Sequence, residues 1–325
     1  MTGQSVGALE GASDQGGALM PARGLGRHAF MSMVKAAVAV FCLVLLGLFL
    51  VLLVGSWPSL RHFGLRFLWT SRWDPVANVF GGLPFIYGTV VSSLIALLLA
   101  AWVGILSALF LAEFAPRQLS GLLGILIELL AAVPSVVFGL WGLFVLAPVV
   151  QNVIGPALQA VFGFLPFFQG VIYGVNMLTA SLILTLMIVP TVMSISRDLV
   201  AGVPGRYREA TLALGSTRWE AVRYVVLPMV KPGVFGACML ALGRALGETI
   251  ATTMVIGNRP SISASLFAPG YTIASAIANE FTEATSNLYI SALIELGLLL
   301  LVISILINAA GRLFLARISR EGGPA

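Results

Sequence analysis

The sequence contains a charged, regularly patterned stretch, Arg206-Tyr-Arg-Glu-Ala-Thr-Leu-Ala-Leu-Gly-Ser-Thr-Arg-Trp-Glu-Ala-Val-Arg-Tyr-Val-Val-Leu-Pro228. It lies in the loop 196–232, which connects two apolar runs, 171–195 and 233–257. Each run is long enough to cross a bilayer, because an α-helix needs about 20 apolar residues to do so. The pattern therefore predicts a membrane protein with a structured loop at one face of the bilayer.

Local signals within this stretch predict two short helices joined at Gly215. Pro204 suits a helix start, and Gly215 suits the C-terminal cap of the first helix. Thr217 and Glu220 have the spacing of a capping box, which predicts a second helix running towards Leu227. The same charges would also suit a solvated connector that only anchors topology.

The composition excludes a soluble protein. Of the 325 residues, 59% are hydrophobic and only 10% are charged, and the mean hydropathy is +1.01. A soluble domain carries about 25% charged residues, so this chain has too few to cover a water-facing surface. We expect an all-α integral membrane protein with six transmembrane helices, at about 34–56, 84–112, 121–147, 171–195, 233–257 and 287–310.

The distribution of basic residues predicts the orientation. Residues 1–33 have few bulky apolar side chains and are expected to form a flexible cytoplasmic tail. The transmembrane domain would cover 34–318 and a C-terminal tail 319–325. Lys and Arg concentrate near both termini and in the loop 196–232, which places both termini in the cytoplasm by the positive-inside rule. The expected location is thus a bacterial cytoplasmic (inner) membrane, crossed several times.

Arg244 and Glu248 form the most informative charge pair inside a predicted span. At positions i and i+4 they would share one helix face, and Thr252 would continue that face. Arg244 would lie about 16 Å into a core of about 30 Å, beside the small-residue motif Gly243-x-x-x-Gly247. The pair either locks helices together or offers a cationic step to an anion that crosses the membrane.

Two other carboxylates, Glu128 and Glu295, also fall inside predicted spans. Either could pair with Arg244, line the path or reach the interface, and structural pairing is the favoured interpretation. A guanidinium at mid-membrane suits an oxyanion, because it remains charged and offers a planar fork of donors. Phosphate carries protons at neutral pH and could donate one to Glu248, whereas sulfate could not.

Several function classes lack the residues they need. A P-loop requires Gly-x-x-x-x-Gly-Lys-Ser/Thr, yet Lys35 and Lys231 are the only lysines and neither follows a glycine. His28 and His62 have no neighbouring ligands, so no metal site is expected. The net charge of +5 reports membrane topology rather than nucleic-acid binding. The chain is expected to be no enzyme and to bind no cofactor of its own.

Residues Glu209-Ala-Thr211, Gly215 and Val225-Val-Leu-Pro228 resemble, at the correct spacing, the EAA signature of ABC importer permeases. Thr211 replaces the second alanine of that signature, and Val225 replaces isoleucine. We call the two short helices joined at Gly215 the elbow. The resemblance implies that the elbow is a coupling helix seated in a groove of a cytoplasmic ATPase subunit. It assigns this coupling role to Glu209, Ala210 and Gly215.

Further segments are similar to the permeases of phosphate importers, and the last of them is more similar to the C-type than to the A-type subunit. This resemblance implies a type I ABC importer permease with Arg244 and Glu248 as its functional intramembrane pair. The partners would be an A-type permease, an ATPase dimer that uses ATP-Mg, a periplasmic phosphate-binding protein and membrane lipid. The segments are 80–90, 112–116, 133–140, 242–251 and 253–258.

The implied mechanism is alternating access, driven by ATP, with the outer loops 57–83, 148–170 and 258–286 receiving the binding protein. Trp73, Asp74, Asn258 and Arg259 are weak candidates for that contact. One alternative is a permease for another oxyanion: sulfate, molybdate or phosphonate. A second is a gradient-driven secondary transporter or channel, although no internal repeat is evident. A membrane enzyme is the third.

Overall fold

The computed structural model describes residues 23–321. The chain divides into two units, Met1–Val51 and Leu52–Ala325, and the first helix begins in one and ends in the other. Residues 1–22 of the expected N-terminal tail and 322–325 of the expected C-terminal tail lie outside the described residues. Residues 23–33, expected to belong to the flexible tail, are helical.

The described residues are mostly helical, and their one β-bridge joins Asp74 and Val79. Six helical runs are long and apolar enough to cross a membrane, which confirms the predicted number. The α-helices are α1 (Arg23–Phe63), α2 (Arg66–Trp69), α3 (Leu83–Leu109), α4 (Arg117–Ala132), α5 (Ser135–Trp141), α6 (Ala147–Val149), α7 (Gly155–Phe162), α8 (Met177–Ala201), α9 (Gly205–Ala213), α10 (Arg218–Ala221), α11 (Leu227–Leu246), α12 (Ile250–Val255), α13 (Ile273–Glu280) and α14 (Asn287–Glu321).

The third span differs from its prediction at 121–147. Helix α4 ends at Ala132 and α5 begins at Ser135, so the helix breaks at Pro134. Proline has no N–H to donate and disfavours a helical conformation in the residue before it, and Val133 is accordingly extended. The run that is long enough to span is Ser135–Phe162, whereas α4 is a shorter apolar helix.

The fifth span, predicted at 233–257, begins earlier and ends earlier. The helical run extends from Arg218 through a π turn, Val222–Val226, to Leu246. It is interrupted at 247–249, and α12 then begins at Ile250. Gly247 is a poor helix former, and Glu248 and Thr249 use their side chains to bond nearby backbone groups, which favours a helix end.

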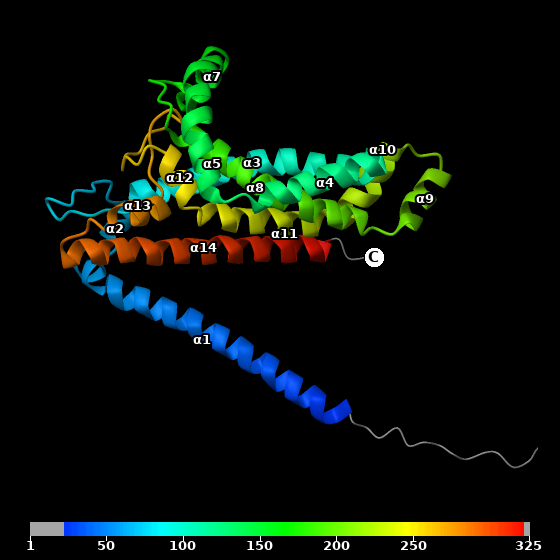
Figure 1. Cartoon of the computed structure of the whole chain (residues 1–325), viewed down its shortest axis with the longest axis horizontal. Helices are drawn as coiled ribbons and strands as arrows, with labels where there is room; N and C mark the ends of the chain where they lie inside the picture. The colour runs from blue at the N-terminus through cyan, green and yellow to red at the C-terminus, as the bar shows by residue number, and fades with distance from the viewer. Residues whose placement is uncertain (1–22, 322–325) are drawn as a thin grey trace, which may run out of the picture. The chain divides into compact units, whose positions relative to one another are not determined.

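Helices α3, α8 and α11 form the centre of the second unit and run side by side with α14 (Figure 1). Their contact surface is built from small side chains, among them Ala96 and Ala100 on α3 and Ala241 and Ala245 on α11. Small residues allow helix backbones to approach closely, which stabilises helix association in a membrane. The elbow lies at one end of these helices and α12 and α13 at the other (Figure 1).

An aromatic cluster closes the end opposite the elbow. Its centre is Trp73, whose ring lies 4.8 Å from that of Phe80, and whose indole N–H donates to Glu280 at 2.7 Å. The hydroxyl of Tyr289 donates to the same Glu280 oxygen, also at 2.7 Å. One carboxylate on α13 therefore holds both the loop before α3 and the first turn of α14.

The turn Asp74–Val79 projects from this cluster. Asp74 accepts hydrogen bonds from Arg72 and from the backbone N–H of Ala77, and these interactions lower the pKa of its carboxyl. Val76 at the tip is 94% exposed. A turn stabilised by its own side chain keeps this apolar tip directed into solvent.

Candidate functional site

The elbow consists of α9 and α10, as the sequence predicts. Gly215 between them has φ +87°, and a Cβ there would meet nothing within 4 Å. Glycine is therefore needed for backbone conformation rather than for space. The predicted capping box is present, with the backbone N–H of Thr217 donating to Glu220 at 2.7 Å. The second helix does not end at Leu227, because it continues through the π turn into α11.

The elbow presents an uncovered apolar surface. Leu214 is 87% exposed and Trp219 is 51% exposed, and Ala210 and Glu209 are also exposed. The ring of Phe114 lies 6.4 Å from that of Trp219 and covers part of it. An exposed leucine and tryptophan on a short, rigid helix pair are typical of a surface that docks another protein.

Arg208 anchors the elbow to the membrane helices. Its guanidinium donates to Glu113, with Nη2 2.6 Å from Oε1, and to the backbone oxygens of Val200 and Val203 at 2.7 and 2.6 Å. Glu113 lies in the π turn Phe110–Phe114 that follows α3, and Val200 lies in the last turn of α8. Side-chain exposure of the pair is only 23% and 11%. No local pattern in the sequence predicts this pair, since 95 residues separate its members.

Arg244 and Glu248 are not arranged as predicted. Arg244 lies in the last turn of α11 and is exposed, whereas Glu248 lies in the break beyond it. They do not share one continuous helix face. Among the described side chains the two ion pairs are Arg72–Asp74 and Arg208–Glu113, so Arg244 has no carboxylate partner there.

Glu248 and Thr252 instead organise the start of α12. The Glu248 carboxylate accepts from the backbone N–H of Ala251 at 3.2 Å. Thr252 is buried, and its hydroxyl contacts the Glu248 carbonyl at 2.9 Å and the Ser275 hydroxyl at 3.2 Å. The prediction that Thr252 continues the Arg244 face is wrong, because the break turns Thr252 towards α13.

Within residues 23–321, the small-residue motif beside Arg244 makes no close contact with another helix. A Cβ on Gly243 would meet nothing within 4 Å in the described structure. Close packing occurs elsewhere, at Gly139 of α5, where a Cβ would lie 2.6 Å from the sulfur of Met254 and 3.2 Å from the Cα of Ala251. The helix that follows Pro134 therefore packs directly on α12, beside the second break.

The remaining intramembrane carboxylates occupy different environments. Glu128 is exposed on α4. Glu295 on α14 is 3% exposed, and its Oε2 has no hydrogen-bond partner in the described structure. Neither carboxylate forms an ion pair with Arg244 among the described residues. Ser59 is a polar neighbour of Glu295, and its hydroxyl oxygen is also buried.

The helical fold, the exposed elbow and the interrupted helix are those of a permease of an ABC importer. Residues 100–320 match the family described as binding-protein-dependent transport system inner membrane component, and the chain belongs to this family. The chain is 48% identical to the phosphate transport system permease protein PstC of Mesorhizobium japonicum, over 88% of this chain and 89% of the relative. This confirms the family resemblance found in the sequence.

Other relatives and solved structures agree. The corresponding PstC proteins of Pasteurella multocida and Haemophilus influenzae are 45% and 44% identical, over 88% and 90% of this chain and 90% and 95% of theirs. The fold is similar to a chain of the MetNI methionine ABC transporter, with a TM-score of 0.55, 15% identity and coverage of 76% of this chain and 99% of that one. It is also similar to a chain of a bacterial alginate ABC transporter, with a TM-score of 0.54, 15% identity and coverage of 91% of this chain and 97% of that one. The predicted type I importer permease fold is confirmed.

Proposed function

We propose that this chain is a permease subunit of an ATP-driven importer that moves inorganic phosphate across the bacterial cytoplasmic membrane by alternating access. The observation that carries the proposal is the 48% identity to a phosphate transport system permease over nearly the whole chain. The relatives do not favour sulfate, molybdate or phosphonate, nor a gradient-driven transporter. The density of basic residues around the elbow supports a cytoplasmic location for the elbow and for both termini.

The interruption between α11 and α12 is the proposed site where the substrate binds on its way across the membrane. A discontinuous membrane helix frees backbone groups at its ends, and such ends recur at the binding sites of transporters. Arg244 lies at one side of the interruption with its guanidinium exposed and unpaired among the described residues. A guanidinium binds phosphate oxygens through two parallel N–H donors and stays charged when water is excluded.

Glu248 and Thr252 have different proposed roles at this site. Glu248 shapes the start of α12 by accepting a hydrogen bond from the Ala251 N–H. Its other carboxylate oxygen would accept a hydrogen bond from a protonated phosphate. Thr252 is buried and supports α12 against α13 through Ser275. Glu248 and Arg244 would thus contact the substrate, while Thr252 positions the segment that carries Glu248.

The same proposal assigns the partners. Arg244 is exposed in the single chain, so a related A-type permease would enclose the path from the other side. Glu209, Ala210 and Gly215 form the surface that fits a groove of a cytoplasmic ATPase dimer, which would bind and hydrolyse ATP-Mg. The projecting turn Asp74–Val79 lies at the opposite end, where a periplasmic phosphate-binding protein would dock. This chain itself would bind no cofactor and perform no hydrolysis.

The test is reconstitution of this chain with the A-type permease, the ATPase and the binding protein in vesicles. We expect ATP-dependent phosphate uptake that excess sulfate does not inhibit. Arg244→Gln should abolish uptake while the subunits still assemble, and Arg223→Gln, a control at the elbow, should retain it. Inhibition by sulfate would favour the oxyanion alternative, and uptake without the ATPase subunit would contradict an ATP-driven importer.

A further inference from the structure

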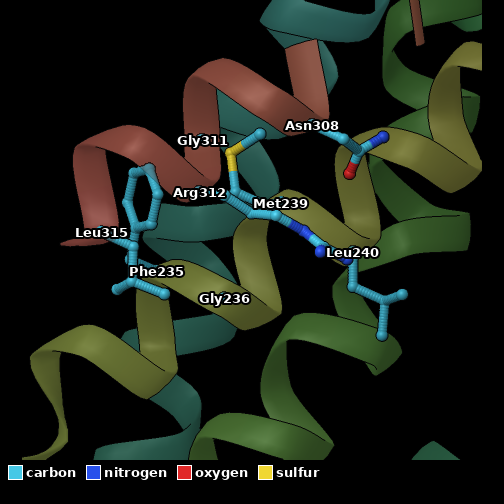
Figure 2. A pocket seen from close by; sticks show the side chains of 8 residues that line it. All are labelled: Phe235, Gly236, Met239, Leu240, Asn308, Gly311, Arg312 and Leu315. Carbon is cyan, nitrogen blue, oxygen red and sulfur yellow. The ribbon is translucent and has the colours of Figure 1, made fainter. Parts of the chain in front are cut away.

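A groove of about 260 Å³ lies between α11 and the C-terminal part of α14. Its walls are the apolar side chains of Phe235, Met239, Leu240 and Leu315. Figure 2 shows Arg312 reaching from α14 across this groove towards α11, on the side where Asn308 also lies. The groove therefore combines an apolar lining with a cation.

The charge at the groove is not neutralised by this chain. Arg312 is exposed and has no ion-pair partner among the described side chains. Lys231 is exposed on α11 one turn before Phe235, so it lies on the helix face that lines the groove. Two positive charges thus face an apolar surface, which favours an occupant that has both an anionic and an apolar part.

The depth of the groove matches the boundary of the hydrocarbon core. From Asn287, the first residue of α14, to Arg312 the helix rises about 38 Å at 1.5 Å per residue, more than the core thickness of about 30 Å. Arg312 would therefore lie at the level of lipid headgroups. One to two turns closer to the bilayer centre, Leu240 and Ile305 are 61% and 56% exposed and offer an apolar surface to an acyl chain.

We propose that this groove binds an anionic phospholipid of the leaflet next to the elbow, with its phosphate on Arg312 and one acyl chain along Leu240 and Ile305. Arginine matches the geometry of a phosphate with two donors, and basic pockets between membrane helices are suited to anionic headgroups. A zwitterionic lipid is bound less well, because its own ammonium group competes for the phosphate. The alternative occupant is a helix of a partner subunit.

The test uses the full-length chain in detergent and native mass spectrometry with two lipids of identical acyl chains, phosphatidylglycerol and phosphatidylcholine. The wild-type chain should retain phosphatidylglycerol preferentially. Arg312→Gln should lower its retention about fivefold, the effect of one basic residue near a membrane surface, and leave phosphatidylcholine unchanged. Arg223→Gln, which removes an exposed cation outside the groove, should change neither.

A second variant blocks the groove while it keeps the charge of Arg312. A Cβ on Gly236 would meet nothing within 4 Å, so the side chain of Gly236→Phe starts in open space and should occupy the groove. Retention of both lipids should then fall while the melting temperature stays within a few degrees. The proposal is overturned by lipid retention that neither variant changes. It is equally overturned by a disulfide between Leu240→Cys and a cysteine in a partner permease of the assembled complex, since a helix would then occupy the groove.

Discussion

The guanidinium of Arg208 lies 2.6 Å from the carboxylate of Glu113 and also donates to the backbone oxygens of Val200 and Val203. One side chain on the elbow therefore contacts both the end of α3 and the end of α8. Because the pair is largely shielded from water, its hydrogen bonds are charge-assisted and geometrically specific. The elbow is thus attached to α3 and α8, two of the three helices that form the centre of the second unit.

Loss of the Arg208–Glu113 ion pair should uncouple the elbow from the membrane helices. Glu113→Gln replaces a carboxylate with a neutral amide, and hydrogen bonds to charged groups contribute about 1.5–3 kcal/mol. We expect reduced phosphate uptake per ATP hydrolysed, with the ATPase still bound. Arg206→Gln is the matched control, because Arg206 is exposed on α9, the helix that carries Arg208, and its guanidinium lies 5.2 Å from the centre of the neighbouring Tyr207 ring. Equal losses in both variants would contradict the anchoring role.

The apolar surface of the elbow should determine ATPase binding. Leu214→Asp places a charge where the partner would bury a leucine, which is worth about 1.5–3 kcal/mol. The affinity for the ATPase, measured in detergent by surface plasmon resonance, should fall at least about tenfold. Val76→Asp serves as the control, since Val76 is 94% exposed at the opposite end. Unchanged affinity in Leu214→Asp would exclude this surface.

Glu248→Gln separates the chemical role of this carboxylate from its structural role. The amide oxygen can still accept the Ala251 N–H, so α12 should form normally and the subunits should assemble. The variant loses the carboxylate that would accept a hydrogen bond from a protonated phosphate. Phosphate uptake should therefore fall while ATPase binding is unaffected. Uptake at the wild-type rate would remove Glu248 from the substrate path.

The contact between α5 and α12 should be sensitive to volume. Gly139→Val inserts atoms where a Cβ already lies 2.6 Å from Met254, and overpacking typically costs about 1–3 kcal/mol. Displacement of α12 should reduce uptake. Gly121→Val on α4 is the control, because a Cβ at Gly121 meets nothing within 4 Å. Similar uptake in both variants would show that the packing of α5 on α12 does not position the proposed substrate site.

Glu295 should tolerate loss of its charge. It is buried with an unpartnered oxygen and has no cation partner among the described residues, so an ionised form would be costly. Glu295→Gln should therefore unfold at the same or a higher temperature, whereas Glu295→Ala should be destabilised by about 2 kcal/mol or more through the cavity it leaves. Loss of uptake in Glu295→Gln would instead identify a functional carboxylate.

Local signals in the sequence were sufficient for the elbow and for the number of spans. Gly215 and the Thr217–Glu220 capping box act through neighbouring residues, so both could be predicted. The helix ends at Pro134 and Gly247 were not predicted, because membrane helices often continue through proline and glycine and tertiary packing decides which ones break. The Arg208–Glu113 pair depends on how α3 and α8 approach each other, which no local pattern reveals.

Glu280 accepts hydrogen bonds from both Trp73 and Tyr289, at 2.7 Å each. Ser286, which accepts the backbone N–H of Tyr289, also donates to Asn78 of the projecting turn at 3.2 Å. A force applied to that turn would therefore reach the first turn of α14 through both links. The long axis of α14 would carry that push across the bilayer towards Arg312. Docking of the proposed binding protein on one side of the membrane and the proposed lipid contact on the other would then be mechanically connected by one helix.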